Sequence, residues 1–243
     1  MGQQDSLLIY RTIIRNMRKT VKRTRKQKGG GSPVTIIGVA GGSGSGKTET
    51  AHMIADSIKS SNSDPTTEVY VISMDDYYKE TTHKNHKGDL IRMPSDHDWD
   101  SPEAYDIDRL VSDLTDLKQG CPIYVPTFNF KTHLVSIERS KRIRPTANQY
   151  IVLEGLFALH NDLLPLLDHK IFIDLDVKEA TRRRVKRNTK RYAGVKTVAQ
   201  IKDEQPPINK KYAPWISRFR AVADEIIDTG TGLSRPGGQE ASY

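Results

Sequence analysis

One eight-residue segment restricts the fold of this chain more than any other feature. Gly41-Gly42-Ser43-Gly44-Ser45-Gly46-Lys47-Thr48 follows the apolar, β-branched run Thr35–Ala40 and leads into the helical-looking segment Glu49–Lys59. It fits the pattern G-x-x-x-x-G-K-[ST], in which backbone N–H groups converge on phosphate oxygens at the N-terminus of a helix. Because strand, loop and helix arrive in the required order, we predict a site for a nucleoside triphosphate.

The motif gives its residues different tasks. Lys47 is expected to reach the β- and γ-phosphates of the nucleotide, and the Thr48 hydroxyl is expected to ligate Mg²⁺. The remaining positions are expected to cradle the phosphates: Gly41, Gly42, Ser43, Gly44, Ser45 and Gly46. A P-loop occurs in kinases, GTPases and motor ATPases alike, so other residues must decide which reaction takes place.

The rest of the chain supplies the strands of a sheet. Four further apolar, β-branched runs are separated by segments long enough for crossover helices: Val69–Ser73, Tyr150–Leu153, Lys170–Leu175 and Glu225–Ile227. Such runs suit a parallel sheet that is buried on both faces. We therefore predict an α/β P-loop NTPase fold with a doubly wound, mainly parallel five-stranded sheet.

Segments outside that sheet define the remaining organisation. Prolines bound extended stretches within 121–145, which predicts an inserted β-hairpin subdomain, and 178–202 is predicted to form a basic helical lid. We expect a P-loop domain over 34–230, a basic tail with a Gly/Ser/Pro linker over 1–33, and a disordered C-terminal tail over 231–243.

The net charge of +8 is concentrated in two segments. Residues 1–28 hold nine lysines and arginines against one acid, so the remaining chain is neutral overall. Within that remainder, 178–191 holds eight lysines and arginines against one acid. This block fits a lid over the triphosphate, since Arg183 and Arg187 lie at i, i+4 on one helix face and can contact the same phosphates. A solvated basic face and an RNA-binding patch are the alternatives.

Carboxylates at two strand ends predict the reaction centre. One apolar run ends in Ser73-Met74-Asp75-Asp76, and another ends in Leu153-Glu154-Gly155. In an open α/β sheet, ligands bind beyond the carboxyl ends of the strands, so both carboxylates are expected near the γ-phosphate. Asp75 is then placed to deprotonate an acceptor hydroxyl, and Glu154 to hold a metal-bound water. The structural alternatives are a helix N-cap for Asp75 and a structural hydrogen bond for Glu154.

Eight segments together resemble the uridine kinase and phosphoribulokinase-like family of P-loop small-molecule kinases. In chain order they are GGSGSGKT, ISMDDYYK, DWDSPEAYD, VPTFNFKTH, IVLEGLFAL, KIFIDLD, RRVKR and ADEII. The resemblance implies ATP-dependent phosphorylation of a primary hydroxyl, which for uridine kinases is the 5′-hydroxyl of uridine or cytidine. It also implies that Asp75 is the catalytic aspartate and Glu154 the magnesium-associated glutamate.

The resemblance further implies an acceptor pocket. Asp100 matches the carboxylate that binds ribose hydroxyls, and five positions match the lining of the base pocket: Tyr78, Trp99, Phe128, Phe130 and His133. An ionised Asp100 can accept two hydrogen bonds from a cis-diol, and aromatic side chains commonly flank a planar base. The structural alternatives are a hairpin-surface position for His133 and core packing for Phe128 and Phe130.

Two positions depart from the uridine kinase pattern. Phe128 stands where these kinases usually carry a tyrosine hydroxyl, and Ala180 stands where they carry an arginine one turn before Arg183. A lost donor in a polar pocket can change specificity by orders of magnitude. Nicotinamide riboside, pantothenate and ribulose 5-phosphate therefore stay open as acceptors, and a non-metabolic NTPase recruited to a membrane or to RNA is the rival from another class.

The N-terminal tail leaves three interpretations open. Apolar residues recur at helical spacing over Leu7–Val21, and the start of the chain matches the loose myristoylation pattern M-G-x-x-x-[ST]. An anionic membrane surface, an organelle-targeting role and a partner-binding or homo-oligomerisation helix each fit residues 1–28. No run approaches the ~18 consecutive apolar residues of a membrane span, and no apolar signal peptide opens the chain. We expect a cytoplasmic protein with a small-molecule acceptor and no nucleic-acid partner.

Overall fold

A computed structural model of the chain describes residues 15–16, 34–84, 87, 89–92, 98–191, 197–231 and 233–237. Of the basic tail and linker over 1–33, only residues 15–16 are described. The amphipathic pattern over Leu7–Val21 therefore lies almost entirely outside the described residues. Among the helices that are described, none has both the length and the apolar character needed to cross a membrane.

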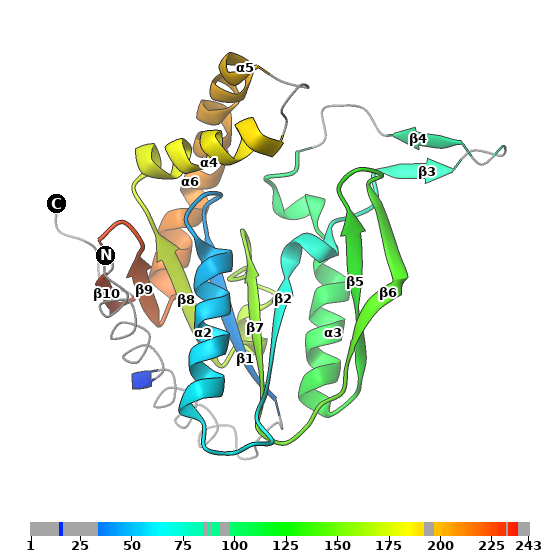
Figure 1. Cartoon of the computed structure of the whole chain (residues 1–243), viewed down its shortest axis with the longest axis vertical. Helices are drawn as coiled ribbons and strands as arrows, with labels where there is room; N and C mark the ends of the chain where they lie inside the picture. Colours follow the sequence, from blue (N-terminus) through cyan, green and yellow to red (C-terminus); the bar gives the residue numbers. More distant parts are fainter. Residues whose placement is uncertain are drawn as a thin grey trace.

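A six-stranded sheet forms the centre of the fold (Figure 1). The five strands predicted from the sequence are all present and run parallel to their neighbours, which confirms the doubly wound α/β fold. From one edge to the other, the order is β10 (Leu233–Pro236), β9 (Glu225–Asp228), β8 (His169–Asp174), β1 (Val34–Gly41), β7 (Gln149–Gly155) and β2 (Glu68–Ser73).

The sixth strand, β10, corrects the disorder predicted for 231–243. Leu233–Pro236 pair antiparallel with β9, so part of that segment extends the sheet at its edge. Gly237 follows the strand so closely that a Cβ atom there would lie 1.9 Å from the carbonyl oxygen of Ala223. Gly237, which composition alone would associate with a flexible segment, therefore allows two stretches of backbone to approach each other closely. Residues 238–243 lie outside the described part of the chain.

Helices cover both faces of the sheet, and β1 shows how the sequence directs them. Ile36 belongs to the same core as Leu114 and Phe219, whereas Ile37 belongs to a second core with Ile54. Successive side chains of a strand point to opposite faces, so β1 is buried on both sides. The covering helices are α2 (Lys47–Ser61) on one face and α3 (Ile107–Gln119) and α6 (Gln205–Val222) on the other.

Two hairpins lie outside the main sheet (Figure 1). The hairpin predicted within 121–145 is formed by β5 (Ile123–Asn129) and β6 (Leu134–Ile143), with an irregularity between Val125 and Thr127. A shorter one, β3 (Thr82–Lys84) with β4 (Leu90–Arg92), has no counterpart among the predicted elements. The remaining elements are η1 (Met74–Tyr77), η2 (Pro102–Ala104), η3 (Leu164–Leu166), α4 (Val177–Arg191) and α5 (Val198–Asp203).

Candidate active site

The loop between β1 and α2 has the backbone shape that the motif predicts. Gly44 and Gly46 both have φ of 89°, in the left-handed region that glycine adopts at little cost. Gly46 is also the N-cap of α2 and supplies no side chain to bond the first-turn N–H groups of that helix. Those N–H groups can donate hydrogen bonds to phosphate oxygens, and the positive end of the helix dipole favours the negative charge of a phosphate.

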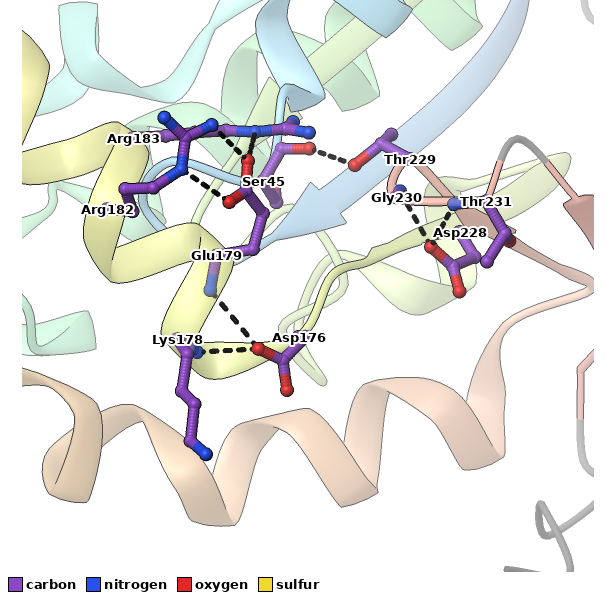
Figure 2. A network of polar contacts seen from close by, with 10 residues as sticks. All are labelled: Ser45, Asp176, Lys178, Glu179, Arg182, Arg183, Asp228, Thr229, Gly230 and Thr231. Carbon is purple, nitrogen blue, oxygen red and sulfur yellow. Dashed lines mark hydrogen bonds and ion pairs between the residues drawn. The ribbon is translucent and has the colours of Figure 1, made fainter. Parts of the chain in front are cut away.

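The loop is held in place by a residue that follows another strand of the sheet. Thr229, directly after β9, donates a hydrogen bond from Oγ1 to the carbonyl oxygen of Ser45 at 2.7 Å (Figure 2). The turn that carries Thr229 is closed by the Asp228 carboxylate, which accepts from the N–H groups of Gly230 at 2.7 Å and Thr231 at 3.1 Å. Sequence reasoning missed this contact, because the motif itself gives no sign of what supports the loop.

Glu154 lies at the centre of a chain of hydrogen bonds that connects the P-loop to β2. Its Oε2 accepts from Thr48 Oγ1 at 3.1 Å, and its Oε1 accepts from Ser73 Oγ at 2.7 Å. The sheet register explains this arrangement, since Glu154 on β7 lies opposite Val39 of β1 on one side and Ser73 of β2 on the other. Ser73 was not singled out from the sequence, although its position as the polar residue that ends β2 is visible there.

Ser73 also connects this chain of hydrogen bonds to Asp75. Its Oγ accepts from the Asp75 N–H at 3.3 Å, and Ser73 is the N-cap of η1. The capping role that was the alternative for Asp75 therefore belongs to Ser73, and Asp75 is a half-buried residue of η1, directly after the end of β2.

The neighbouring carboxylate, Asp76, has a different environment. It accepts a hydrogen bond from the backbone N–H of Phe128, which ties η1 to the β5–β6 hairpin. Burial raises the pKa of Asp76, and the nearby charges of Asp75 and Glu154 raise it further. Asp76 therefore ties η1 to the hairpin and also lies within the electrostatic influence of Asp75 and Glu154.

The oxygens of Thr48 and Glu154 fit a magnesium ion held partly by the nucleotide. Mg²⁺ prefers oxygen ligands, keeps several waters and is usually bound by one or two carboxylates together with substrate phosphates. Across the described residues, no group of three or more histidine, cysteine, aspartate or glutamate side chains is arranged to hold a metal ion. The Thr48 hydroxyl and the Glu154 carboxylate, beside a phosphate-binding loop, are protein ligands of the kind that a magnesium ion shared with a nucleotide uses.

The structure brings all five predicted base-pocket residues together. Ring centroids lie 5.2 Å apart for Tyr78 and Trp99, 5.3 Å apart for Tyr78 and Phe128, and 4.9 Å apart for Trp99 and His133. Phe130 lies 5.2 Å from Phe128 and is 45% exposed, whereas Phe128 is buried. The five rings come from the residue after η1, the segment before η2, β5 and the hairpin turn, so only the fold places them in one cluster.

One member of this cluster was missed. Tyr105 stacks on Tyr78 with a centroid distance of 4.3 Å and donates a hydrogen bond from its hydroxyl to the Tyr78 hydroxyl at 2.7 Å. The Tyr78 hydroxyl in turn donates to the carbonyl oxygen of Trp99 at 3.2 Å. At the hairpin turn, His133 has φ of 57° and its Nδ1 lies 3.0 Å from Thr81 Oγ1. The rings are therefore fixed by hydrogen bonds as well as by packing.

Asp100 adjoins a ring of the aromatic cluster in the chain and shares a cavity with P-loop residues. It lines one cavity with Ser43 and Ser45, and it follows Trp99 directly in the chain. Burial raises the pKa of Asp100, while the positive charges of Arg184, Lys211 and Lys47 oppose that increase. The carboxylate is therefore close to both predicted halves of the site.

The basic helix α4 reaches the P-loop through two predicted arginines. Arg187 donates from Nη2 to Ser43 Oγ at 3.1 Å. Arg183 donates from Nε to Glu179 at 2.8 Å, and its Nη1 lies 4.0 Å from the position that a Cβ on Gly46 would occupy (Figure 2). Arg182 pairs with the same glutamate at 2.7 Å but has a 67% exposed side chain.

Comparison with known proteins shows to which family this chain belongs. The model of the phosphoribulokinase/uridine kinase family matches residues 36–232. This chain belongs to that family. The uridine kinase of Staphylococcus epidermidis is 36% identical over 197 residues, which cover 81% of this chain and 88% of the relative. The uridine kinase of Staphylococcus carnosus is 34% identical over the same shares of the two chains.

A solved structure supports the family's fold. Phosphoribulokinase from Rhodobacter spheroides matches with a TM-score of 0.53 and 13% identity, over 81% of this chain and 70% of that chain. As a member of the phosphoribulokinase/uridine kinase family, the chain is an ATP-dependent phosphotransferase that acts on a hydroxyl group. Its acceptor is a small molecule.

Proposed function

We propose that this kinase transfers the γ-phosphoryl group of ATP to the 5′-hydroxyl of uridine, cytidine or a related nucleoside. The observation that carries the proposal is the cluster of five predicted rings, together with Asp100, which follows Trp99 in the chain and lines a cavity with Ser43 and Ser45 of the P-loop. Flat rings suit a base, and a carboxylate suits the cis-diol of ribose. The relatives that are named uridine kinases support the same acceptor class.

On the donor side, the chain binds and orients the triphosphate. Backbone N–H groups at the start of α2 bind phosphate oxygens, and Lys47 neutralises the β- and γ-phosphates. Arg183 and Arg187 approach the loop from α4 and stabilise the charge on the transferring phosphoryl oxygens. Thr48 and Glu154 would hold Mg²⁺, which supplies further neutralisation of phosphate charge when bound.

On the acceptor side, Asp75 acts as the general base. The 5′-hydroxyl gives its proton to the Asp75 carboxylate while its oxygen forms the new bond to the γ-phosphorus. The bond between that phosphorus and the β,γ-bridging oxygen breaks, and the electron pair leaves with ADP. Ser73 positions Asp75 through the backbone bond at 3.3 Å and at the same time donates to Glu154, so that the base and the metal-binding carboxylate are held by one hydroxyl.

Asp100 and the rings select the acceptor. Asp100 accepts hydrogen bonds from the two ribose hydroxyls, and the base lies against the aromatic cluster. Phe128 offers no hydroxyl to the base, so we expect recognition of the base to depend on ring contacts and on His133 more than on Phe128.

An acceptor panel tests this proposal. The full chain is incubated with Mg²⁺ and ATP together with uridine, cytidine, nicotinamide riboside, pantothenate, ribulose 5-phosphate or no acceptor, and ADP formation is followed. We expect the highest kcat/KM with a pyrimidine nucleoside and the lowest rate without acceptor, with Lys47→Ala as the control for contaminating kinases. Use of pantothenate alone would rule out the ribose assignment of Asp100, and acceptor-independent turnover would favour a non-metabolic NTPase.

A further inference from the structure

One hydroxyl outside the P-loop bonds to the backbone of that loop. Thr229 Oγ1 donates to the carbonyl oxygen of Ser45 at 2.7 Å, and the Thr229 methyl carbon lies 3.9 Å from the position that a Cβ on Gly46 would occupy (Figure 2). Ser45 is buried and Thr229 is half-buried. The hydrogen bond therefore joins the turn after β9 to the peptide unit that directly precedes α2.

The residues around Ser45 do not by themselves fix the orientation of this peptide unit. Ser45 stands between two glycines, and Gly44 and Gly46 each have φ of 89°. Glycine adopts either sign of φ at little cost, so the unit between Ser45 and Gly46 could rotate until its carbonyl oxygen and its N–H group exchanged directions. A rotated unit would turn a carbonyl oxygen toward the phosphates, where an N–H donor is needed.

We propose that Thr229 is a positioning residue for the triphosphate, because its bond to the Ser45 carbonyl oxygen keeps the Gly46 N–H directed at the phosphates. A trans peptide unit is planar, and its C=O and N–H bonds point in opposite directions, so a carbonyl oxygen held by Thr229 fixes the N–H on the other side. The Ser45 N–H already donates to the Gly42 carbonyl oxygen at 3.0 Å, and Gly46 is the next donor along the chain. The inference rests on the donor side of the proposed function, in which N–H groups at the start of α2 bind phosphate oxygens.

The backbone of Thr229 is itself held by hydrogen bonds on both sides. Its N–H donates to the carbonyl oxygen of Asp174, the last residue of β8, at 3.1 Å. On its other side, the Asp228 carboxylate accepts from the N–H groups of Gly230 and Thr231 and closes the turn. Because this turn is ordered before the nucleotide binds, little conformational freedom is lost there on binding. The Thr229 hydroxyl is therefore suited to fix the loop in its phosphate-binding shape.

Thr229→Val tests the inference, because it removes the hydroxyl and keeps a methyl group beside Gly46. The Gly46 amide signal of the full chain is followed by ¹H–¹⁵N NMR while inorganic triphosphate is added. We expect the Gly46 amide proton to shift downfield in the wild type and to shift less in Thr229→Val, whose Kd for triphosphate rises about fivefold, as for the loss of one neutral hydrogen bond. Thr229→Ser keeps the hydroxyl and should restore both quantities. Thr231→Val removes a nearby hydroxyl, which accepts from the Leu233 N–H, and should change neither.

Steady-state kinetics complete the test. In Thr229→Val, we expect KM for ATP to rise about fivefold while KM for the acceptor changes by less than about twofold, since the contact lies on the donor side. A Gly46 amide that responds equally in the wild type and in Thr229→Val would overturn the inference and leave the proposed function intact. Equal weakening in Thr229→Ser would also overturn it, because that variant keeps the hydroxyl. A wild-type Gly46 amide that does not respond to triphosphate would show instead that the phosphate-binding groups in the proposed function are wrong, and the role of Thr229 would fall with them.

Discussion

The donor side and the acceptor side of the site are built in different ways. On the donor side, the P-loop is one contiguous segment whose phosphate-binding groups are mostly backbone N–H donors and whose charged residue, Lys47, is cationic. The acceptor side is assembled from side chains separated by as many as 55 positions along the chain, between Tyr78 and His133, and its charged residues are carboxylates. The difference teaches that phosphate binding depends on one short segment of the sequence, whereas the acceptor side depends on the fold to bring distant side chains together.

Asp75→Asn should give the largest difference between an effect on catalysis and an effect on ATP binding. We expect kcat to fall by about 10³-fold, since a general base contributes roughly 10²- to 10⁴-fold, while the Kd for ATP changes by less than about twofold. Single-turnover kinetics and ATP titration of the same variant measure both quantities. Asp76→Asn is the matched control at the adjacent position, and its kcat should change less than about tenfold. A fall of only a few-fold for Asp75→Asn would remove Asp75 as the base.

This contrast also explains how far the sequence alone could predict the site. The P-loop was predictable because its function depends on glycines and a lysine that are contiguous in the chain. The five parallel strands were predictable because each is an apolar, β-branched run between turn-forming segments. Ser73, Tyr105 and Thr229 were missed, since each makes a contact with a residue distant in sequence or outside its own motif.

The basic block within 178–191 also shows that composition and spacing do not predict which side chains become buried. Eight basic residues within 178–191 are equivalent in composition, and helical spacing predicts only which of them share a face. Burial of Arg184 depends on how α4 sits against α6 and the P-loop, as its hydrogen bond to Asn209 shows. The disorder predicted for 231–243 was wrong over Leu233–Pro236 because an edge strand offered backbone partners that composition does not reveal.

Glu154→Gln tests whether the Glu154 carboxylate, which is hydrogen-bonded to Thr48 and Ser73, helps to bind Mg²⁺. We expect the Mg²⁺ concentration for half-maximal activity to rise about 10- to 100-fold, because the variant loses the negative charge while it keeps the shape that Thr48 and Ser73 bond to. Activity is measured against Mg²⁺ at fixed ATP. Ser73→Ala leaves the carboxylate in place and is expected to show a smaller rise. An unchanged Mg²⁺ requirement in Glu154→Gln would assign Glu154 a structural hydrogen bond instead.

His133→Ala tests the acceptor side alone. We expect the ratio of kcat/KM values for uridine and cytidine to change by about tenfold, as for the loss of one polar contact to a base, while KM for ATP stays the same. Competition between the two nucleosides in one reaction gives the ratio directly. Thr81→Ala removes the hydroxyl 3.0 Å from His133 Nδ1 and should change the ratio in the same direction by less. Equal loss of activity with both nucleosides would indicate a role for His133 in hairpin packing only.

The N-terminal tail should matter least to catalysis. Residues 1–28 carry a charge equal to the whole net charge of +8, and we propose that they bind an anionic membrane surface. A chain that begins at Pro33 should keep kcat within about threefold, or ~0.7 kcal/mol in the barrier. It should also lose the salt-sensitive binding to phosphatidylserine vesicles expected of the full chain. Loss of activity on truncation would show that the tail is part of the fold or of an oligomer.

The position of the new phosphate bond tests the central claim, that the two sides meet at the 5′-hydroxyl of a nucleoside, most directly. The full chain is incubated with ATP, Mg²⁺ and uridine, and the product is examined by proton-coupled ³¹P NMR. A phosphate on the 5′-carbon couples to two protons and gives a triplet, which is the result we predict, and 5′-deoxyuridine should give no phosphorylated product. A doublet, from a phosphate on a secondary ribose carbon, or inorganic phosphate as the only product would contradict the account.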